Sequence, residues 1–244
     1  MIAYARGRAH YDMKNKSILK RLVTFIVLVI LLSTPTCLTG SNNGELPIYK
    51  IDDEWVYIIT VGGETIELTT TIAGTETVDG HECYIVEGTL SPPILVGYDS
   101  MRSWIAKSDP TLSILRTELM GIHEGTSIII STVTSIDYPD GAPWPLEIDN
   151  TFTLVKRITS SVTYGEDTQT DPEILETSHW VVEGKEDVTV PAGVFDCYKL
   201  SQYTEDNALQ SRRWYSNDIK NDVKREQPFD EIVKFQELES HSLA

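Results

Sequence analysis

The chain has 244 residues, of which 41% are apolar, so it can bury a core as one large all-β domain or two smaller domains. Its formal net charge is −17. Because an acidic surface repels phosphate backbones, this charge argues against nucleic acid as a partner.

The N-terminal residues have the pattern of a secretory signal. The apolar run LVTFIVLVILL (residues 22–32) follows a basic stretch made of Lys14, Lys16, Lys20 and Arg21. The run is shorter than the roughly 20 apolar residues of a spanning helix. An uncleaved N-terminal anchor nevertheless remains an alternative to a cleaved signal. Translation could begin at Met1 or at Met13, which opens a normal signal start.

Cys37 lies five residues after the apolar run, where a lipoprotein cysteine would stand. The residues Thr34-Pro35-Thr36 depart from the usual lipobox, so three alternatives remain: lipidation at Cys37, cleavage nearby without lipid, and retention as an anchor. Each of them places the body outside the cytoplasm, where disulfides are allowed. We therefore expect a signal, lipoprotein or anchor segment over residues 1–37 and a flexible tether over residues 38–46.

The body reads as a series of strands separated by turns. Segments rich in Thr, Ile, Val and Tyr, which suit a pleated half-buried surface, occupy residues 54–61, 64–72, 82–90, 126–136 and 152–164. Between them stand turn signals such as Asp79-Gly80 and Asp140-Gly141. Residues 109–121 (DPTLSILRTELMG) could form a short helix, but their place in an internal repeat favours a strand.

The repeat consists of three blocks in the same order in each half. PIYKIDDEWVYII from Pro47 matches PLEIDNTFTLVK from Pro145, and the later blocks align Cys83 with Cys197, Trp104 with Trp214, Arg116 with Arg225, and Glu118 with Glu226. We therefore predict two related antiparallel β units, over residues 47–140 and 141–244, which form a sandwich or a partly open barrel.

The second unit resembles a family of exported, β-rich prokaryotic proteins, many of them lipoproteins, most of which have no assigned function. The resemblance rests on the blocks WPLEIDNTFT, VTVPAGVFDCYKL and WYSNDIKNDVKRE, within residues 145–240. Asn221-Asp222 replaces a glycine-containing step of the family pattern. The resemblance implies an all-β envelope protein that acts as an accessory or binding module, and it carries no catalytic residues to transfer.

Cys83 and Cys197 are the candidate reactive residues. A cysteine nucleophile needs a base and a lowered pKa, and no histidine stands in a recognised catalytic motif with either cysteine. Metal-ligand spacings such as Cys-x-x-Cys do not occur. A Cys83–Cys197 disulfide and two buried thiols remain as alternatives. In the block VTVPAGVFDCYKL we expect Phe195 and Cys197 to face the core.

The remaining candidates are interpreted as structural. The acidic turns at 52–54 and 137–141 could help to hold Ca²⁺, but they lack the alternation of a calcium loop and read as solvated turns. His81 and His179 read as polar surface groups. Trp144 is expected at the surface or between the halves. Four other tryptophans lie in predicted strands, namely Trp55, Trp104, Trp180 and Trp214. The repeat-matched Trp55, Trp104 and Trp214 are expected to fill the core.

These observations predict a non-enzymatic envelope protein, tethered to the membrane through an N-terminal lipid or anchor, that binds a ligand or an envelope protein. A carrier of a hydrophobic ligand such as a lipid is the alternative, and a hydrolase is a weaker one. We expect no catalytic residues, no cofactor and no metal.

Overall fold

The computed structural model describes residues 46–61, 63–94, 97–109, 113–229 and 232–244. The export segment and Cys37 lie outside the described residues. The chain divides into two units, Met1–Thr34 and Pro35–Ala244, and both expected repeats belong to the second. Across the described ranges there is no helix with the length and apolar character needed to cross a membrane.

The first half of the body is a run of strands, as its alternating β-branched residues predict. They are β1 (Glu54–Val61), β2 (Glu64–Val78), β3 (His81–Ile94), β4 (Tyr98–Ala106), β5 (Ile114–His123) and β6 (Thr126–Asp137). Strand β5 lies in the segment that could have been a helix, so the prediction of a strand there is confirmed.

The second half is built in the same way. Its strands are β7 (Thr151–Tyr164), β8 (Asp167–Thr170), β9 (Ile174–Val190), β10 (Gly193–Thr204), β11 (Leu209–Ser216), β12 (Asn221–Phe229) and β13 (Ile232–Ser242). Both β8 and β9 pair with β7, β8 along residues 161–164 and β9 along residues 151–158. The two therefore act as one interrupted strand beside β7.

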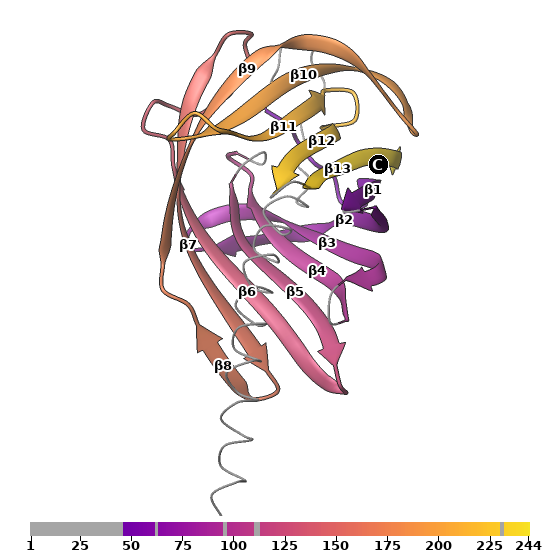
Figure 1. The fold of residues 1–244 in the computed structure, drawn as a ribbon, viewed down its shortest axis with the longest axis vertical. Helices are drawn as coiled ribbons and strands as arrows, with labels where there is room; N and C mark the ends of the chain where they lie inside the picture. Colours follow the sequence, from indigo (N-terminus) through magenta and orange to yellow (C-terminus); the bar gives the residue numbers. More distant parts are fainter. Residues whose placement is uncertain (1–45, 62, 95–96, 110–112, 230–231) are drawn as a thin grey trace, which may run out of the picture. The chain divides into compact units, whose positions relative to one another are not determined.

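The sheet closes on itself. Successive strands pair antiparallel, β6 pairs with β7 through ten residue pairs, and β1 pairs with β13. The result is a closed ring of twelve strands with the short β8 attached to β7, and β1 and β13 lie side by side in Figure 1. The antiparallel all-β prediction is confirmed, whereas a sandwich or partly open barrel is wrong. Closure removes the free strand edges that either alternative would leave.

Closure gives every strand an inward and an outward face, because side chains alternate along a strand. In β1 the alternate residues Trp55, Tyr57 and Ile59 are buried. In the second half an apolar cluster gathers residues from the linker and from β7, β9, β10 and β11: Leu146, Phe152, Leu154, Trp180, Val182, Tyr198, Leu200 and Tyr215.

The segments that lead into β1 and β7 share their backbone geometry. Asp52 and Asp149 have φ angles of 74° and 67°. The N–H groups of these two residues donate to the carbonyls of Ile72 and Val182, each at 2.9 Å. One aligned pair needs correction: Arg116 lies opposite Trp104, whereas the residue opposite Trp214 is Lys224. The cross-strand register therefore matches Arg116 with Lys224 rather than with Arg225.

The block VTVPAGVFDCYKL forms the tip of the long β9–β10 hairpin, which curves toward β13 (Figure 1). The N–H of Ala192, in its turn, donates to the Leu238 carbonyl at 3.1 Å. The structure agrees only in part with the prediction that Phe195 and Cys197 face the core. Cys197 is buried, but Phe195 is only half-buried, and Tyr198 and Leu200 belong to the apolar cluster. Both faces of β10 are covered because the hairpin folds against its neighbours.

A buried carboxylate links the two ends of the ring. Asp53, which is fully buried, accepts hydrogen bonds from the Lys50 N–H at 3.0 Å and the Ala244 N–H at 2.9 Å. It also pairs with the Lys220 ammonium at 3.1 Å, in the turn between β11 and β12. The prediction of a solvated turn is therefore wrong for Asp53, because closure buries this carboxylate against three segments of the chain.

The Asp53 contacts predict a large stability difference between two neighbouring substitutions. Asp53→Asn leaves the Lys220 ammonium without its carboxylate and should lower the free energy of unfolding by about 3 kcal/mol. Asp52→Asn is the matched control, because Asp52 is exposed and asparagine tolerates its positive φ. Denaturant titration measures both, and equal stability of the two variants would contradict the role given to Asp53.

Candidate functional site

Both described cysteines are free, buried thiols. The Cys83 thiol donates to the His81 carbonyl at 3.5 Å, and the Cys197 thiol donates to the Phe195 carbonyl at 3.3 Å. They lie on β3 and β10, which are six strands apart in the ring. The structure therefore holds the pair as thiols and not as the disulfide that the sequence left open.

The surroundings of the cysteines disfavour a thiolate. Burial is the main cause that raises the pKa of Cys197, and the nearby carboxylates of Asp196 and Asp222 raise it further. Burial also raises the pKa of Cys83. Both thiols therefore stay protonated at neutral pH, and a protonated thiol is a poor nucleophile.

The histidines and acidic turns named from the sequence do not come together as a site. His81 and His179 are exposed, and the His179 ring contacts the Thr153 hydroxyl at 3.3 Å. The His123 ring packs edge-on against Tyr164. In the part of the chain that the structure describes, no group of three or more His, Cys, Asp or Glu residues is arranged to hold a metal ion.

The four strand tryptophans are buried, but not all of them fill the barrel interior. Trp104 and Trp214 lie on the outward face, where Arg116 covers the first ring at 4.9 Å and Lys224 covers the second at 5.5 Å. Trp144 packs against Tyr215. Its indole N–H donates to Asp109 at 3.2 Å, and Asp109 also accepts hydrogen bonds from Tyr138 and Ser113. Trp144 thus joins the linker to both halves, as expected.

A charged row crosses the inward face of β11, β12 and β13. Arg213 lies opposite Arg225, Arg225 lies opposite Gln236, and Gln236 lies opposite the buried Ile59 of β1. Directly paired residues in a sheet share a face, so the two arginines and the glutamine point the same way as Ile59. Arg213 and Arg225 are each only 6% exposed, and Gln236 is 2% exposed.

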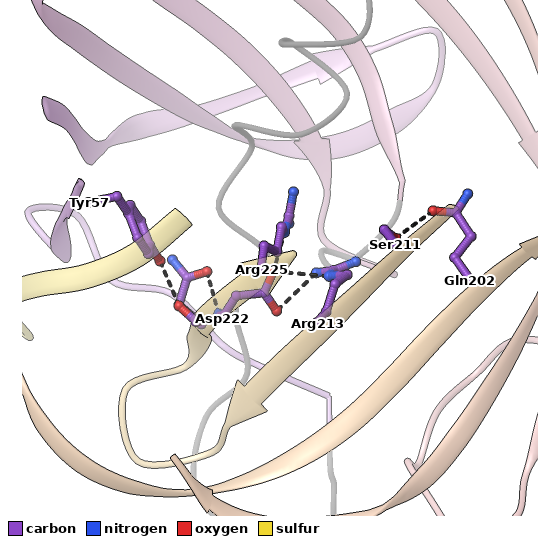
Figure 2. Close-up of polar contacts among 7 residues, drawn as sticks. Tyr57, Gln202, Ser211, Arg213, Asp222 and Arg225 are labelled. Atoms are coloured by element: carbon purple, nitrogen blue, oxygen red, sulfur yellow. Dashed lines mark hydrogen bonds and ion pairs between the residues drawn. The ribbon is translucent and has the colours of Figure 1, made fainter. Parts of the chain in front are cut away.

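Asp222 lies between the two arginines (Figure 2). Its carboxylate accepts hydrogen bonds from Arg213 Nε at 2.9 Å, from Arg213 Nη2 at 3.2 Å and from Arg225 Nε at 2.5 Å. Burial lowers the pKa of Arg213 to about 10, and Asp222 opposes that shift. The Arg213 guanidinium therefore stays charged at neutral pH inside the protein.

The facing wall carries a row of hydroxyl groups at the matching positions. Ser103 precedes Trp104 as Arg213 precedes Trp214. The row continues through direct cross-strand neighbours on β5, β6 and β7, and its members are Ser103, Thr117, Thr132 and Ser160. All four are buried, and the hydroxyls bond in two pairs, at 3.1 and 3.3 Å. Strands β4–β6 are six places from β11–β13 in the ring, so the two rows lie on opposite walls.

We call these two rows, with Asp222, the polar layer. Apolar residues adjoin it. On the first wall the next inward row consists of Met101, Leu119, Ile130 and Val162, and on the second wall the inward neighbours include Tyr57, Leu238, Tyr215 and Tyr198. On the other side of the charged row the same-face neighbours are polar, and Ser211 donates to Gln202 at 2.8 Å. A layer of charge and hydroxyls inside the ring is costly to bury and is a candidate binding site.

Several polar atoms near the charged row lack a hydrogen-bond partner among the described residues. They include the side-chain oxygen of Gln236 and the hydroxyls of Tyr215 and Tyr49, all in buried residues. Buried polar atoms are usually satisfied, so each of these atoms marks a position where an interaction partner would be favourable.

Comparison with known proteins gives little at the level of sequence: no protein-family model and no curated protein matches the chain. Two solved structures match. One is a protein from Bacteroides fragilis that has a YmcC-like fold and has been inferred to be exported. It is 13% identical, and the match covers 85% of this chain and 99% of that one at a TM-score of 0.37.

The other is a protein from Parabacteroides distasonis that has been inferred to be a lipoprotein. It is 14% identical, and the match covers 83% of this chain and 100% of that one at a TM-score of 0.35. At such TM-scores these matches say nothing about the polar layer. The family resemblance of residues 145–240 stays a prediction.

The buried thiols predict a simple outcome for thiol counting. Native protein should react slowly with a thiol reagent, and denatured protein without reductant should show two reactive thiols from Cys83 and Cys197, plus a third where Cys37 remains unmodified. Burial and the raised pKa of both groups are the reasons. Thiols that appear only after reduction would show that the cysteines are bonded.

Proposed function

We propose that the chain is an exported protein of the cell envelope, held at the membrane by its N-terminal segment. The support is the sequence of that segment, with its basic stretch, the apolar run over residues 22–32 and Cys37 just beyond. A lipid on Cys37 or a retained anchor would each serve as the tether.

We further propose that the barrel is a non-enzymatic binding module whose ligand lies within the ring, at the polar layer. An eight-stranded barrel has an interior just wide enough for its own side chains, and a ring of twelve is wider. The observation that carries the proposal is the enclosed row of Arg213, Arg225 and Gln236 facing a row of small hydroxyl residues. The apolar rows beside it suit a ligand with a large apolar part, which makes a carrier of a lipid-like molecule the favoured form.

We also propose that the barrel arose by duplication of a six-stranded unit. The supporting facts are the matched sequence blocks, the paired hydrogen bonds of Asp52 and Asp149, and the cations that cover Trp104 and Trp214 in the same way. The inward rows then differ between the copies. The first copy keeps hydroxyls and the second carries charges, and such divergence suits a site that holds an asymmetric ligand.

Native mass spectrometry of the protein released from its own membranes tests the proposed function. We expect a ligand of lipid-like mass to remain bound and to be lost on unfolding, because the polar layer is enclosed. The intact mass of the polypeptide reports the tether, since a diacylglyceryl group on Cys37 adds a defined mass. Protein that carries no ligand and takes up none from an added envelope lipid extract would contradict the binding role.

A further inference from the structure

We propose that the polar layer binds an uncharged head group with several hydroxyls, a glycerol or a sugar, and that the apolar part of the same ligand lies along the neighbouring apolar row. This inference rests on the proposed binding function and specifies its ligand. The supporting observations are buried hydrogen-bonding atoms that have no partner among the described residues. Glycerol and sugar head groups share the chemistry that such atoms would recognise.

Two glutamine side chains present buried acceptor oxygens to the interior. Gln236 lies opposite Arg225, and Gln227 lies two residues beyond Arg225 on β12, so the two glutamines are diagonal neighbours on the inward face. The side-chain oxygen of each is buried and has no hydrogen-bond partner among the described residues. Because an unsatisfied buried acceptor is costly, each oxygen favours a ligand that donates a hydrogen bond.

Two tyrosine hydroxyls near the charged row, those of Tyr49 and Tyr215, also have no hydrogen-bond partner in the part of the chain that the structure describes. Tyr49 lies close enough to Tyr215 to contribute to the raised pKa of Tyr215, after the larger effect of burial. Burial likewise raises the pKa of Tyr49. Both hydroxyls therefore stay protonated at neutral pH and can either donate or accept a hydrogen bond.

A hydroxylated group suits this set of atoms better than an ion does. A carboxylate accepts hydrogen bonds but donates none, so it would leave both glutamine oxygens unsatisfied. An ammonium group donates but does not accept, and it would lie beside Arg225, where like charges repel. A hydroxyl can donate to a glutamine oxygen and accept from a tyrosine. Because Tyr215, Gln227 and Gln236 lie on three successive strands, a head group with several hydroxyls is needed to reach them all.

The hydroxyl row on the facing wall can bond the same head group. In each of its two pairs one hydroxyl donates to the other, so the second O–H group remains able to donate. Both members of each pair also keep an oxygen lone pair that can accept. The row therefore offers donors and acceptors without charge, and its members are Ser103, Thr117, Thr132 and Ser160.

The adjoining apolar row indicates the rest of the ligand. It consists of Met101, Leu119, Ile130 and Val162, each two residues from a member of the hydroxyl row on the same strand. A free sugar or glycerol would leave this row without a role in binding. An apolar tail would bury surface against it and gain the usual free energy of that burial. An uncharged amphiphile fits both parts of the interior.

Four probes with an octyl or octanoyl tail test the head group. They are 1-octanoylglycerol, octyl glucoside, methyl octanoate and octanoate, each titrated by calorimetry against the exported protein below its micelle concentration. We expect the two hydroxylated probes to bind at least tenfold more tightly than methyl octanoate and octanoate, because neither of those donates a hydrogen bond to the buried oxygens. Tighter binding of one hydroxylated probe than of the other supports the inference and identifies the head group as glycerol or sugar.

The same titrations can contradict the inference. Methyl octanoate or octanoate that binds as tightly as both hydroxylated probes would overturn it and leave the binding role intact. Free glycerol or glucose that binds as tightly as the octyl and octanoyl compounds would overturn the part assigned to the tail.

Variants then locate the site. Gln236→Leu should weaken both hydroxylated probes at least tenfold and leave methyl octanoate unchanged. Gln169→Leu is the matched control, because Gln169 is an exposed glutamine on β8, and it should change none of the affinities. Tyr215→Phe covers the case in which Gln236→Leu fails to fold, since it removes a hydroxyl that has no partner among the described residues. It should weaken the hydroxylated probes several-fold.

Two results would separate the inference from the function on which it rests. Hydroxylated probes that bind Gln236→Leu and Tyr215→Phe as tightly as the unmodified protein would place the head group elsewhere, and only the inference would fail. Protein that binds none of the probes and also carries no ligand from its membrane would remove both.

Discussion

Closure of the sheet is the constraint on which the rest of the structure depends. The pairings of β1 with β13 and of β6 with β7 turn a meander into a ring, and every alternate side chain then faces inward. Asp53 supports this closure by tying the start of β1 to the β11–β12 turn and to Ala244. Without closure, Arg213 and Arg225 would face solvent. With it, their charges become an interior feature that the fold must stabilise.

Contacts of Asp222 and Trp180 contribute to that stabilisation. Asp222 accepts hydrogen bonds from both arginines, its backbone carbonyl accepts one from Tyr57 at 3.1 Å, and the Arg213 guanidinium lies 5.7 Å from the centre of the Trp180 ring. A buried ion cluster is often no more stable than an apolar core of the same volume. The cluster lies on strands β11 and β12, whereas the row on β4–β7 consists of neutral hydroxyl residues, and the proposed binding role rests on this difference.

Local patterns in the sequence predicted the strands well, because β-branched residues and turn signals act over short distances. Residues 54–61 and the long run that ends at Tyr164 were placed almost to the residue. Closure was not predictable, since the pairing of β6 with β7 across a Pro-rich linker is set by packing and not by local propensity. For that reason the sequence predicts antiparallel strands but does not distinguish a sandwich from a partly open barrel.

The polar layer escaped prediction for a different reason. Arg212 and Arg213 are adjacent, as are Lys224 and Arg225. Because side chains alternate along a strand, one cation of each pair faces inward and the other outward, and the sequence does not show which of them faces inward. The bulge between Trp214 and Tyr215 further shifts the register of β11 on β12. The same loss of register explains why the repeat pattern aligned Arg116 with Arg225, although the residue opposite Trp214 is Lys224. Only the cross-strand partners, Ile59 above all, identify the inward member.

The guanidinium resonances of the two interior arginines test the central claim most directly, namely that the enclosed charged row is the binding site. In ¹⁵N-labelled protein titrated with 1-octanoylglycerol, we expect the Nε signals of Arg213 and Arg225 to shift and their N–H protons to exchange more slowly, while the Arg116 signal on the outward face stays in place. Bound 1-octanoylglycerol that leaves both interior signals unmoved would contradict the account.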